Sequence, residues 1–308
     1  MKKHRLTTAF SGVLLIFTAI AGHVFARAAG MSIGAYSWYA QWNPAFTNWM
    51  TGDMKSFALG HSYNKKFSMA PRFLYGPSIG FALSDRVSLS AVMLMGRYKP
   101  SASYMKIANL GGGVVNAYGS SRNTRVQRYD VDTSLSVKAV KYLSFYIGVK
   151  YQYYLFKKRT DYSSLDSAID IIGRMDWEIL QNAVGPGLGL SLAFNLVADF
   201  YLTASFSGLY MKPLMTIKVI GFRCVPSATA LVPFKKTMKP DYHYAGANSS
   251  LTFSYYIRKA FLTLAVGFRY QYIYVLGRDA RPDPYFMVFG AFDSMYSQNK
   301  RWDHFYGA

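Results

Sequence analysis

Apolar and polar positions alternate with a period of two through most of the chain. The segment 143–155 carries apolar residues at every odd position and mostly small or polar residues between them. The segments 67–83 and 262–272 repeat this pattern. Because successive side chains of a strand point to opposite faces, each segment predicts a strand with one apolar face and one small or polar face. The segments are about as long as a tilted strand that crosses a bilayer.

About ten strands are predicted in this way. They cover residues 31–42, 67–83, 87–98, 125–139, 143–156, 184–195, 200–211, 243–257 and 260–275, with a last strand that begins near Trp302. Short connections at 84–86, 140–141, 195–199 and 258–259 alternate with long ones at 43–66, 99–123, 157–183, 211–242 and 277–301. A soluble sandwich also alternates apolar and polar positions, but it has no reason to alternate loop length. The predicted fold class is all-β, an antiparallel transmembrane β-barrel of about ten strands with short periplasmic turns and long extracellular loops.

The composition agrees with a membrane barrel. Hydrophobic residues make up 51% of the chain and aromatic residues 17%, yet no segment of the mature part reads as an uninterrupted membrane helix. The best candidate, residues 188–206, contains Asn195 and Asp199. Tyr36, Trp38 and Trp42 open the first predicted strand, and we expect them to belong to an aromatic girdle at the water–lipid boundary.

In this pattern the chain resembles bacterial outer-membrane β-barrel proteins, although it carries no motif of a subfamily. The resemblance implies the cell outer membrane as location and outer-membrane lipid as partner. Members of this group usually finish in a full strand with a terminal aromatic residue, whereas this sequence stops at Phe305-Tyr306-Gly307-Ala308. An incomplete strand leaves backbone groups unpaired in lipid, so we expect the last strand to be truncated.

The N-terminal residues predict a secretory signal peptide over residues 1–26, which leaves one barrel domain over residues 27–308. Lys2, Lys3 and Arg5 form the positive region, and an apolar core and small residues at a cleavage site follow. Loss of this peptide lowers the formal net charge from +20 to +17. For an exported basic protein we expect anionic lipid head groups, small solutes, or a host or matrix surface as partners, and no nucleic acid. The single cysteine, Cys224, cannot form an internal disulfide.

Charged residues on the polar face of the predicted strands are the candidate site residues. We expect seven of them to line the lumen: Arg72, Arg128, Asp130, Asp132, Lys138, Lys150 and Arg269. Two interpretations remain open. In one, these residues form a salt-bridge network that plugs a narrow lumen. In the other, the excess of basic residues lines a conduit that prefers anions.

No catalytic residue, metal ligand or cofactor is predicted. Ten-stranded barrels include the omptin proteases, which carry an aspartate pair and an aspartate–histidine pair, each spaced i, i+2. The spacing of Asp130 and Asp132, and of Asp241 and His243, is similar. However, the alternation places His243 on the lipid-facing side and both members of the aspartate pair inside the barrel. No Cys/His cluster has the spacing of a metal site.

Two of the predicted loops have distinctive sequences. The segment 163–180 places Leu165, Ile169, Ile172 and Trp177 roughly on one side of a helix, which predicts a short helix within the loop. The segment 211–239 mixes apolar and basic residues, which is typical of a surface that adheres to a partner.

The function predicted first is a porin-like channel for small anionic or amphipathic solutes. The alternative is a non-catalytic, surface-exposed barrel that acts as an adhesin or interaction protein through its loops. An omptin-like rim protease and an OmpW-like transporter of hydrophobic solutes are further alternatives. Because barrels of this size serve many functions, the fold by itself does not choose among them.

Overall fold

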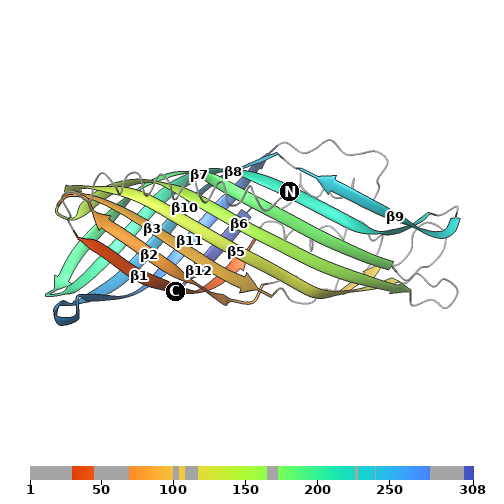
Figure 1. Ribbon diagram of the computed structural model, residues 1–308, viewed down its shortest axis with the longest axis horizontal. Coiled ribbons are helices and arrows are strands. Elements are labelled where there is room, and N and C mark those ends of the chain that lie inside the picture. Colours follow the sequence, from red (N-terminus) through yellow and green to blue (C-terminus); the bar gives the residue numbers. More distant parts are fainter. Residues whose placement is uncertain are drawn as a thin grey trace.

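The computed structural model describes residues 30–44, 69–99, 104–107, 117–164, 173–225, 228–239, 241–277 and 302–308. The predicted signal peptide therefore lies outside the described residues. Tilted strands form a barrel with its long axis horizontal in Figure 1. The wall consists of β1 (Met31–Asn43), β2 (Arg72–Ala82), β3 (Val87–Tyr98), β5 (Ala117–Val140), β6 (Leu143–Ser164), β7 (Gly173–Val197), β8 (Phe200–Val225), β10 (Tyr242–Ile257), β11 (Leu262–Gly277) and β12 (Trp302–Gly307).

Antiparallel pairing connects these ten strands into a closed ring. Each strand pairs with its neighbours in chain order, and β8 pairs directly with β10. The short strands β4 (Tyr104–Ile107) and β9 (Ala228–Met238) pair with β5 and β8 outside the ring. The ring closes where β12 pairs with both β11 and β1. The predicted fold class, an all-β antiparallel barrel, is confirmed.

The short connections lie at one end of the barrel and are built by local turn chemistry. Between β2 and β3, the Ser84 hydroxyl accepts hydrogen bonds from the backbone N–H of Arg86 at 3.3 Å and of Val87 at 3.1 Å. A serine side chain that bonds the backbone in this way favours a tight reversal. The short turns between β7 and β8 and between β10 and β11 contain Ala198 and Phe261, whose positive φ angles of 44° and 50° tighten the chain reversal.

Three loop predictions are wrong in part. β5 begins at Ala117, β6 continues to Ser164, β7 begins at Gly173 and β8 continues to Val225, so parts of 99–123, 157–183 and 211–242 are strand. The helix predicted over 163–180 is wrong at its described residues, since 163–164 and 173–180 belong to strands; residues 165–172 lie outside the described part. The reason is pairing: the ladder between β6 and β7 runs on without a break to Tyr162 and Gly173. Pairing with a neighbouring strand thus makes these polar segments strands, although their own sequence carries no strand pattern.

The outer face of the wall is apolar and exposed. Ile33 is 73% exposed, Leu188 70% and Val266 69%, and outward apolar residues of most other wall strands are exposed too, whereas those of β3 are half-buried. Monomeric soluble proteins rarely expose contiguous apolar surface of this extent, so the exterior suggests a membrane barrel. In the described part of the chain, no helix has the length and hydropathy needed to span a membrane.

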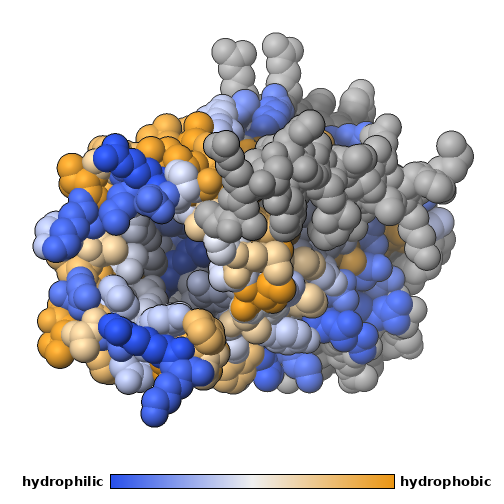
Figure 2. All heavy atoms as spheres, turned by 60° about the vertical axis from the view of Figure 1, so that its left-hand side comes forward, coloured by the Kyte–Doolittle hydropathy of each residue, from blue (hydrophilic) through white to orange (hydrophobic). Residues whose placement is uncertain are grey.

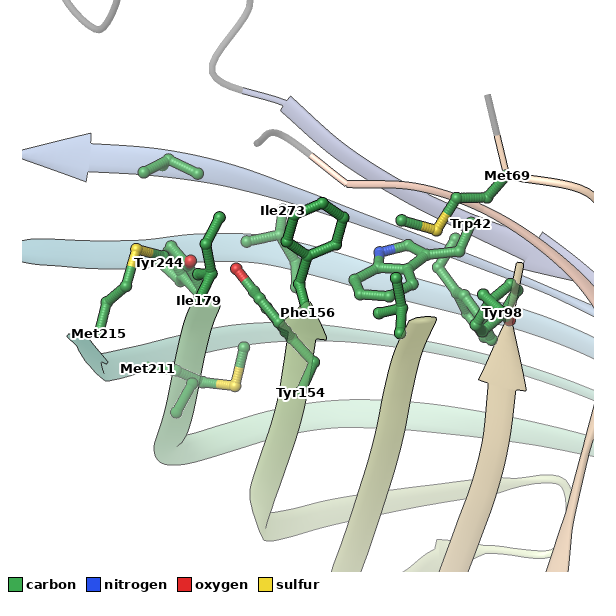
Figure 3. Close-up of a cluster of buried hydrophobic side chains, with 14 of the residues drawn as sticks. Trp42, Met69, Tyr98, Tyr154, Phe156, Ile179, Met211, Met215, Tyr244 and Ile273 are labelled. Carbon is green, nitrogen blue, oxygen red and sulfur yellow. The ribbon is translucent and has the colours of Figure 1, made fainter. Parts of the chain in front are cut away.

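The inner face differs between the two halves of the barrel. Figure 2 looks toward the end with the short connections and shows a hollow between the strands. Toward the other end, large side chains fill the interior (Figure 3). Trp42, Phe156 and Phe305 are each 0% exposed there.

Candidate functional site in the barrel lumen

The structure brings five of the seven predicted lumen residues together. Arg128 and Asp130 of β5 and Lys150 of β6 are buried inside the barrel, and Asp132 and Arg269 are partly buried there. Arg72 and Lys138 are exposed instead, because each lies near the end of its strand, β2 and β5 respectively. These two residues do not contribute to the cluster.

A three-residue ion pair crosses the lumen. The Nζ of Lys150 donates to Oδ1 of Asp132 at 2.8 Å, and Nη2 of Arg269 donates to Oδ2 of the same carboxylate at 2.9 Å. β11, which carries Arg269, lies opposite β5 in the ring, with four wall strands between them in either direction. The contact therefore spans the interior. Charge-assisted hydrogen bonds of this kind hold their partners firmly.

A second charged pair lies further from the short-turn end. Nε of Arg128 donates to Oδ2 of Asp130 at 2.9 Å, and the two side chains are only 1% and 4% exposed. The Arg128 guanidinium lies 4.6 Å from the centre of the Trp42 ring and 4.2 Å from that of Phe305. Cation–π attraction strengthens when water is excluded, so the two rings stabilise the buried charge.

Trp42 lies at the centre of the large side chains that fill this end of the lumen, which we call the buried layer. Its Nε1 donates to Oδ1 of Asp303 at 2.9 Å, and its ring meets Tyr98 and Tyr154 edge-on at 5.4 Å each. These partners come from β12, β3 and β6, so the layer joins distant parts of the wall (Figure 3). The expectation that Trp42 belongs to an aromatic girdle is wrong, because the residue is fully buried inside.

The sequence analysis missed the other large residues of this layer. Tyr154 is buried on the inward face of β6, and the Tyr244 hydroxyl donates to Oε1 of Gln181 within the lumen. One signal was available in the alternation: Tyr154 shares the phase of Lys150, and Trp42 that of Ser32 and Gly34. Parity therefore placed these rings inside the barrel, although their aromatic character pointed to the membrane boundary.

The hollow at the short-turn end contains a polar pocket of about 210 Å³. Lys150, Asp132 and Arg269 line one part of it. Hydroxyl and amide side chains line much of the rest, among them Ser205, Ser207, Asn248 and Ser250, together with Val149 and Leu209. The pocket is open to solvent on the short-turn side, and the layer around Trp42 lies beyond it. Such a site admits water and small polar solutes from one end.

The structure does not assemble the protease-like arrangement. Asp130 is buried in the lumen, whereas the His243 ring lies beside Tyr210 and Lys212 on the outward phase of β8 and β10. Lys212 also pairs with Asp241. The two pairs spaced i, i+2 therefore lie on opposite sides of the wall. Within the described ranges, no group of three or more His, Cys, Asp or Glu side chains could hold a metal ion.

Four wall strands project past the barrel rim at the end away from the short turns. β5, β6, β7 and β8 are 22–26 residues long, whereas β1, β2, β3, β10 and β11 have 11–16 residues. With β9, they form what we call the projecting sheet, residues 117–125, 157–164, 173–180, 216–225 and 228–238 (Figure 1).

Basic side chains dominate the described part of the projecting sheet. Two of its acidic residues are already paired: Arg159 binds Asp176 at 2.9 Å, and both Lys157 and Lys218 bind Glu178. Around these pairs lie exposed basic residues with no ion pair to a described side chain, namely Arg125 and Lys235, with Lys239 directly after β9. The projecting sheet therefore carries uncompensated positive charge.

Comparison with known proteins leaves the family open. No protein-family model matches the chain, and no match was found among curated protein sequences. The function must therefore be argued from the geometry of the lumen and of the projecting sheet.

Glu178 should titrate below the ordinary glutamate pKa of about 4.3. The hydrogen bond from Lys218, at 2.8 Å, lowers its pKa, and the charge of Lys157 acts in the same direction. A depressed pKa means that this carboxylate stabilises the folded sheet above its unfolded pKa, and that the contribution is lost as pH falls through the folded pKa. Side-chain NMR of Glu178 during an acid titration measures the midpoint.

Lys218→Ala should raise that midpoint toward the ordinary value. Lys235→Ala is the matched control, because it removes an exposed lysine from β9 that does not contact Glu178. An unchanged Glu178 midpoint in Lys218→Ala would contradict the assigned cause.

Proposed function

We propose that this protein is a non-catalytic barrel of the bacterial outer membrane that binds an anionic partner outside the cell through the projecting sheet. In this orientation the short turns face the periplasm and the projecting sheet faces outward, as in barrels with short periplasmic turns. The observation that carries the proposal is the uncompensated basic surface of strands that extend beyond the rim.

The filled lumen supports binding over conduction. A pore needs a continuous water-filled path, but the side chains around Trp42 and Arg128 are at most 7% exposed and come from strands all around the ring. A small barrel is often filled by its own side chains in this way. The barrel then serves as a rigid anchor, and the binding residues lie on the strands it holds out.

The charge of the sheet supports an anionic partner such as an acidic polysaccharide. Clustered charge of one sign raises the local concentration of oppositely charged ligands and speeds their association. Because exposed charges are screened by salt over roughly 8–10 Å, such binding weakens as ionic strength rises. A sulfated polysaccharide is a suitable probe.

Reversing three exposed charges should weaken polysaccharide binding by about tenfold or more, since tenfold corresponds to about 1.4 kcal/mol. The variant Arg125→Glu/Lys235→Glu/Lys239→Glu changes residues that are exposed in the projecting sheet or directly beside it. Affinity of the folded protein for an immobilised sulfated polysaccharide is measured at two salt concentrations. The wild-type protein should bind less tightly at the higher concentration.

The matched control reverses three exposed charges at the short-turn end, with Arg86→Glu/Lys141→Glu/Lys259→Glu. Its net charge equals that of the first variant, so a difference between the two assigns binding to the projecting sheet. Equal loss in both variants, or no binding by the wild-type protein, would overturn the proposal.

A gated channel for small anions is the second candidate, and the polar pocket favours it. Lys150 and Arg269 give the pocket two basic groups against the single carboxylate of Asp132. Basic rings favour anions in pores. This function requires the layer around Trp42 to open, and a conductance measurement distinguishes it from the first candidate.

A further inference from the structure

The polar pocket is built by complete ladders of the barrel wall. It lies in the hollow of Figure 2, and its lining residues belong to β5, β6, β7, β8, β10 and β11. Each lining residue, from Asp132 on β5 to Arg269 on β11, pairs with a neighbouring strand on both sides. Side chains on paired strands are held more precisely than side chains on loops, so the pocket is a preformed site.

The charges that line the pocket are not balanced. Lys150 and Arg269 are its basic residues, and Asp132 is the one acidic residue of its described lining. The side chain of Lys150 is 5% exposed, so water and salt screen its charge less than they screen that of a surface lysine. The lining therefore attracts a solute with one negative charge.

Lys150 and Arg269 retain hydrogen-bond donors for such a solute. A lysine ammonium has three N–H donors and an arginine guanidinium has five. Each of the two side chains donates a single hydrogen bond to Asp132, and neither makes another to a described residue. The guanidinium carbon of Arg269 lies 4.8 Å from the centre of the Trp38 ring, which holds the group in place. The free donors suit a carboxylate, because its two oxygen atoms match the N–H groups of a guanidinium.

The rest of the lining supplies groups that bind hydroxyls. The Ser205 and Ser250 hydroxyls lie 2.6 Å apart and share one hydrogen bond, which leaves acceptor lone pairs on both oxygen atoms. Oδ1 of Asn248 is buried and has no hydrogen-bond partner among the described residues. A buried acceptor without a partner is costly, so a ligand hydroxyl that donates to Oδ1 is favoured. The pocket thus combines a site for a carboxylate with a site for hydroxyl groups.

We propose that the pocket binds a small sugar acid, that is, a polyhydroxylated monocarboxylate such as gluconate. The carboxylate binds the free donors of Lys150 and Arg269, and the hydroxyl groups bind Asn248 and the serines beside it. The pocket volume of about 210 Å³ holds about seven water molecules at ~30 Å³ each, which one molecule of gluconate displaces. The proposal rests on the pocket of the small-anion candidate and gives it a solute class, but it requires no passage through the buried layer.

Gluconate should bind the folded full-length protein in detergent micelles in a saturable manner. Two other ligands separate the halves of the site: sorbitol has hydroxyl groups without the carboxylate, and acetate has the carboxylate without hydroxyl groups. Each should bind at least about tenfold more weakly than gluconate, since each loses one set of contacts and tenfold corresponds to about 1.4 kcal/mol. NMR shifts of the backbone amides of residues 248–250, recorded at constant ionic strength, measure the three affinities.

Arg269→Gln should weaken gluconate binding by about tenfold, because it removes the guanidinium that meets the carboxylate. Arg86→Gln is its control, since it removes one positive charge from an exposed residue of a short turn at the same end. Asn248→Leu should weaken gluconate binding by about tenfold and leave acetate binding unchanged, because Oδ1 meets only hydroxyl groups. This variant should fold, since leucine has a similar size and removes an unpartnered buried acceptor. Its control is Asn195→Leu at an exposed position near the end of β7.

No saturable binding of gluconate, or equal affinity for sorbitol or acetate, would overturn the proposal. Full gluconate affinity in either pocket variant, or an equal loss in its surface control, would also overturn it, because the ligand would then be bound elsewhere. All of these variants retain the basic residues of the projecting sheet, and none needs to conduct ions. Gluconate binding can therefore fail while polysaccharide binding or conductance is observed, and the reverse.

Discussion

Asp130→Ala should lower the free energy of unfolding by about 3–5 kcal/mol, because it leaves the buried Arg128 guanidinium without the carboxylate that it hydrogen-bonds. Arg128 is 1% exposed, and Nε donates to Asp130 at 2.9 Å. The aromatic rings of Trp42 and Phe305 remain in place, but cation–π attraction offsets only part of the cost. Urea unfolding in detergent micelles, followed by tryptophan fluorescence, measures the loss.

The double variant Arg128→Met/Asp130→Leu should recover most of this stability, since apolar side chains of similar size can replace a buried ion pair at little cost. Asp85→Ala is the control for loss of a carboxylate, because Asp85 is exposed in a short turn. If Asp130→Ala unfolds at the same urea concentration as the wild-type protein, Arg128 is not held as a buried charge.

Trp42→Ala should lower the free energy of unfolding and should also open a conducting path through the barrel. Removing a buried tryptophan costs about 3–5 kcal/mol through lost packing and the cavity left behind. The lost contacts include Tyr98, Tyr154, Arg128 and the hydrogen bond to Asp303. The cavity would also extend the polar hollow through the buried layer, so the variant should show steady conductance in planar bilayers where the wild-type protein is silent.

Phe261→Ala is the matched truncation, because this residue is 86% exposed in a short turn and contributes nothing to the layer. It should leave conductance and stability nearly unchanged. A steady, anion-selective conductance of the wild-type protein would favour the channel candidate over the anchor. Silence of a folded Trp42→Ala variant would show that the layer is closed by more than this side chain.

The sequence predicted the location of Arg128 and Asp130 correctly but that of Trp42 wrongly. Alternation correctly assigned Arg128 and Asp130 to the inner face, because the two-residue period of a strand is a local property. The same parity applied to Trp42, but its aromatic ring was interpreted as part of a girdle. The aromatic character of Trp42 therefore led to a wrong location, whereas its position in the alternation gave the correct one. The partners of these residues were beyond prediction, since Trp42 and Asp303 are separated by 261 positions.

Alternation and turn spacing alone predict the barrel fold and the strand ends that adjoin the short turns. β1, β3 and β10 match the predicted ranges within one residue, because short turns and period-two segments are encoded locally. How far β5, β6, β7 and β8 extend depends on tertiary structure, since each extension is stabilised by a neighbouring strand. Tertiary structure also brings Asp132 to Arg269 across the lumen and places β12 between β11 and β1. Those contacts depend on the tilt and stagger of the whole ring, which no single segment specifies.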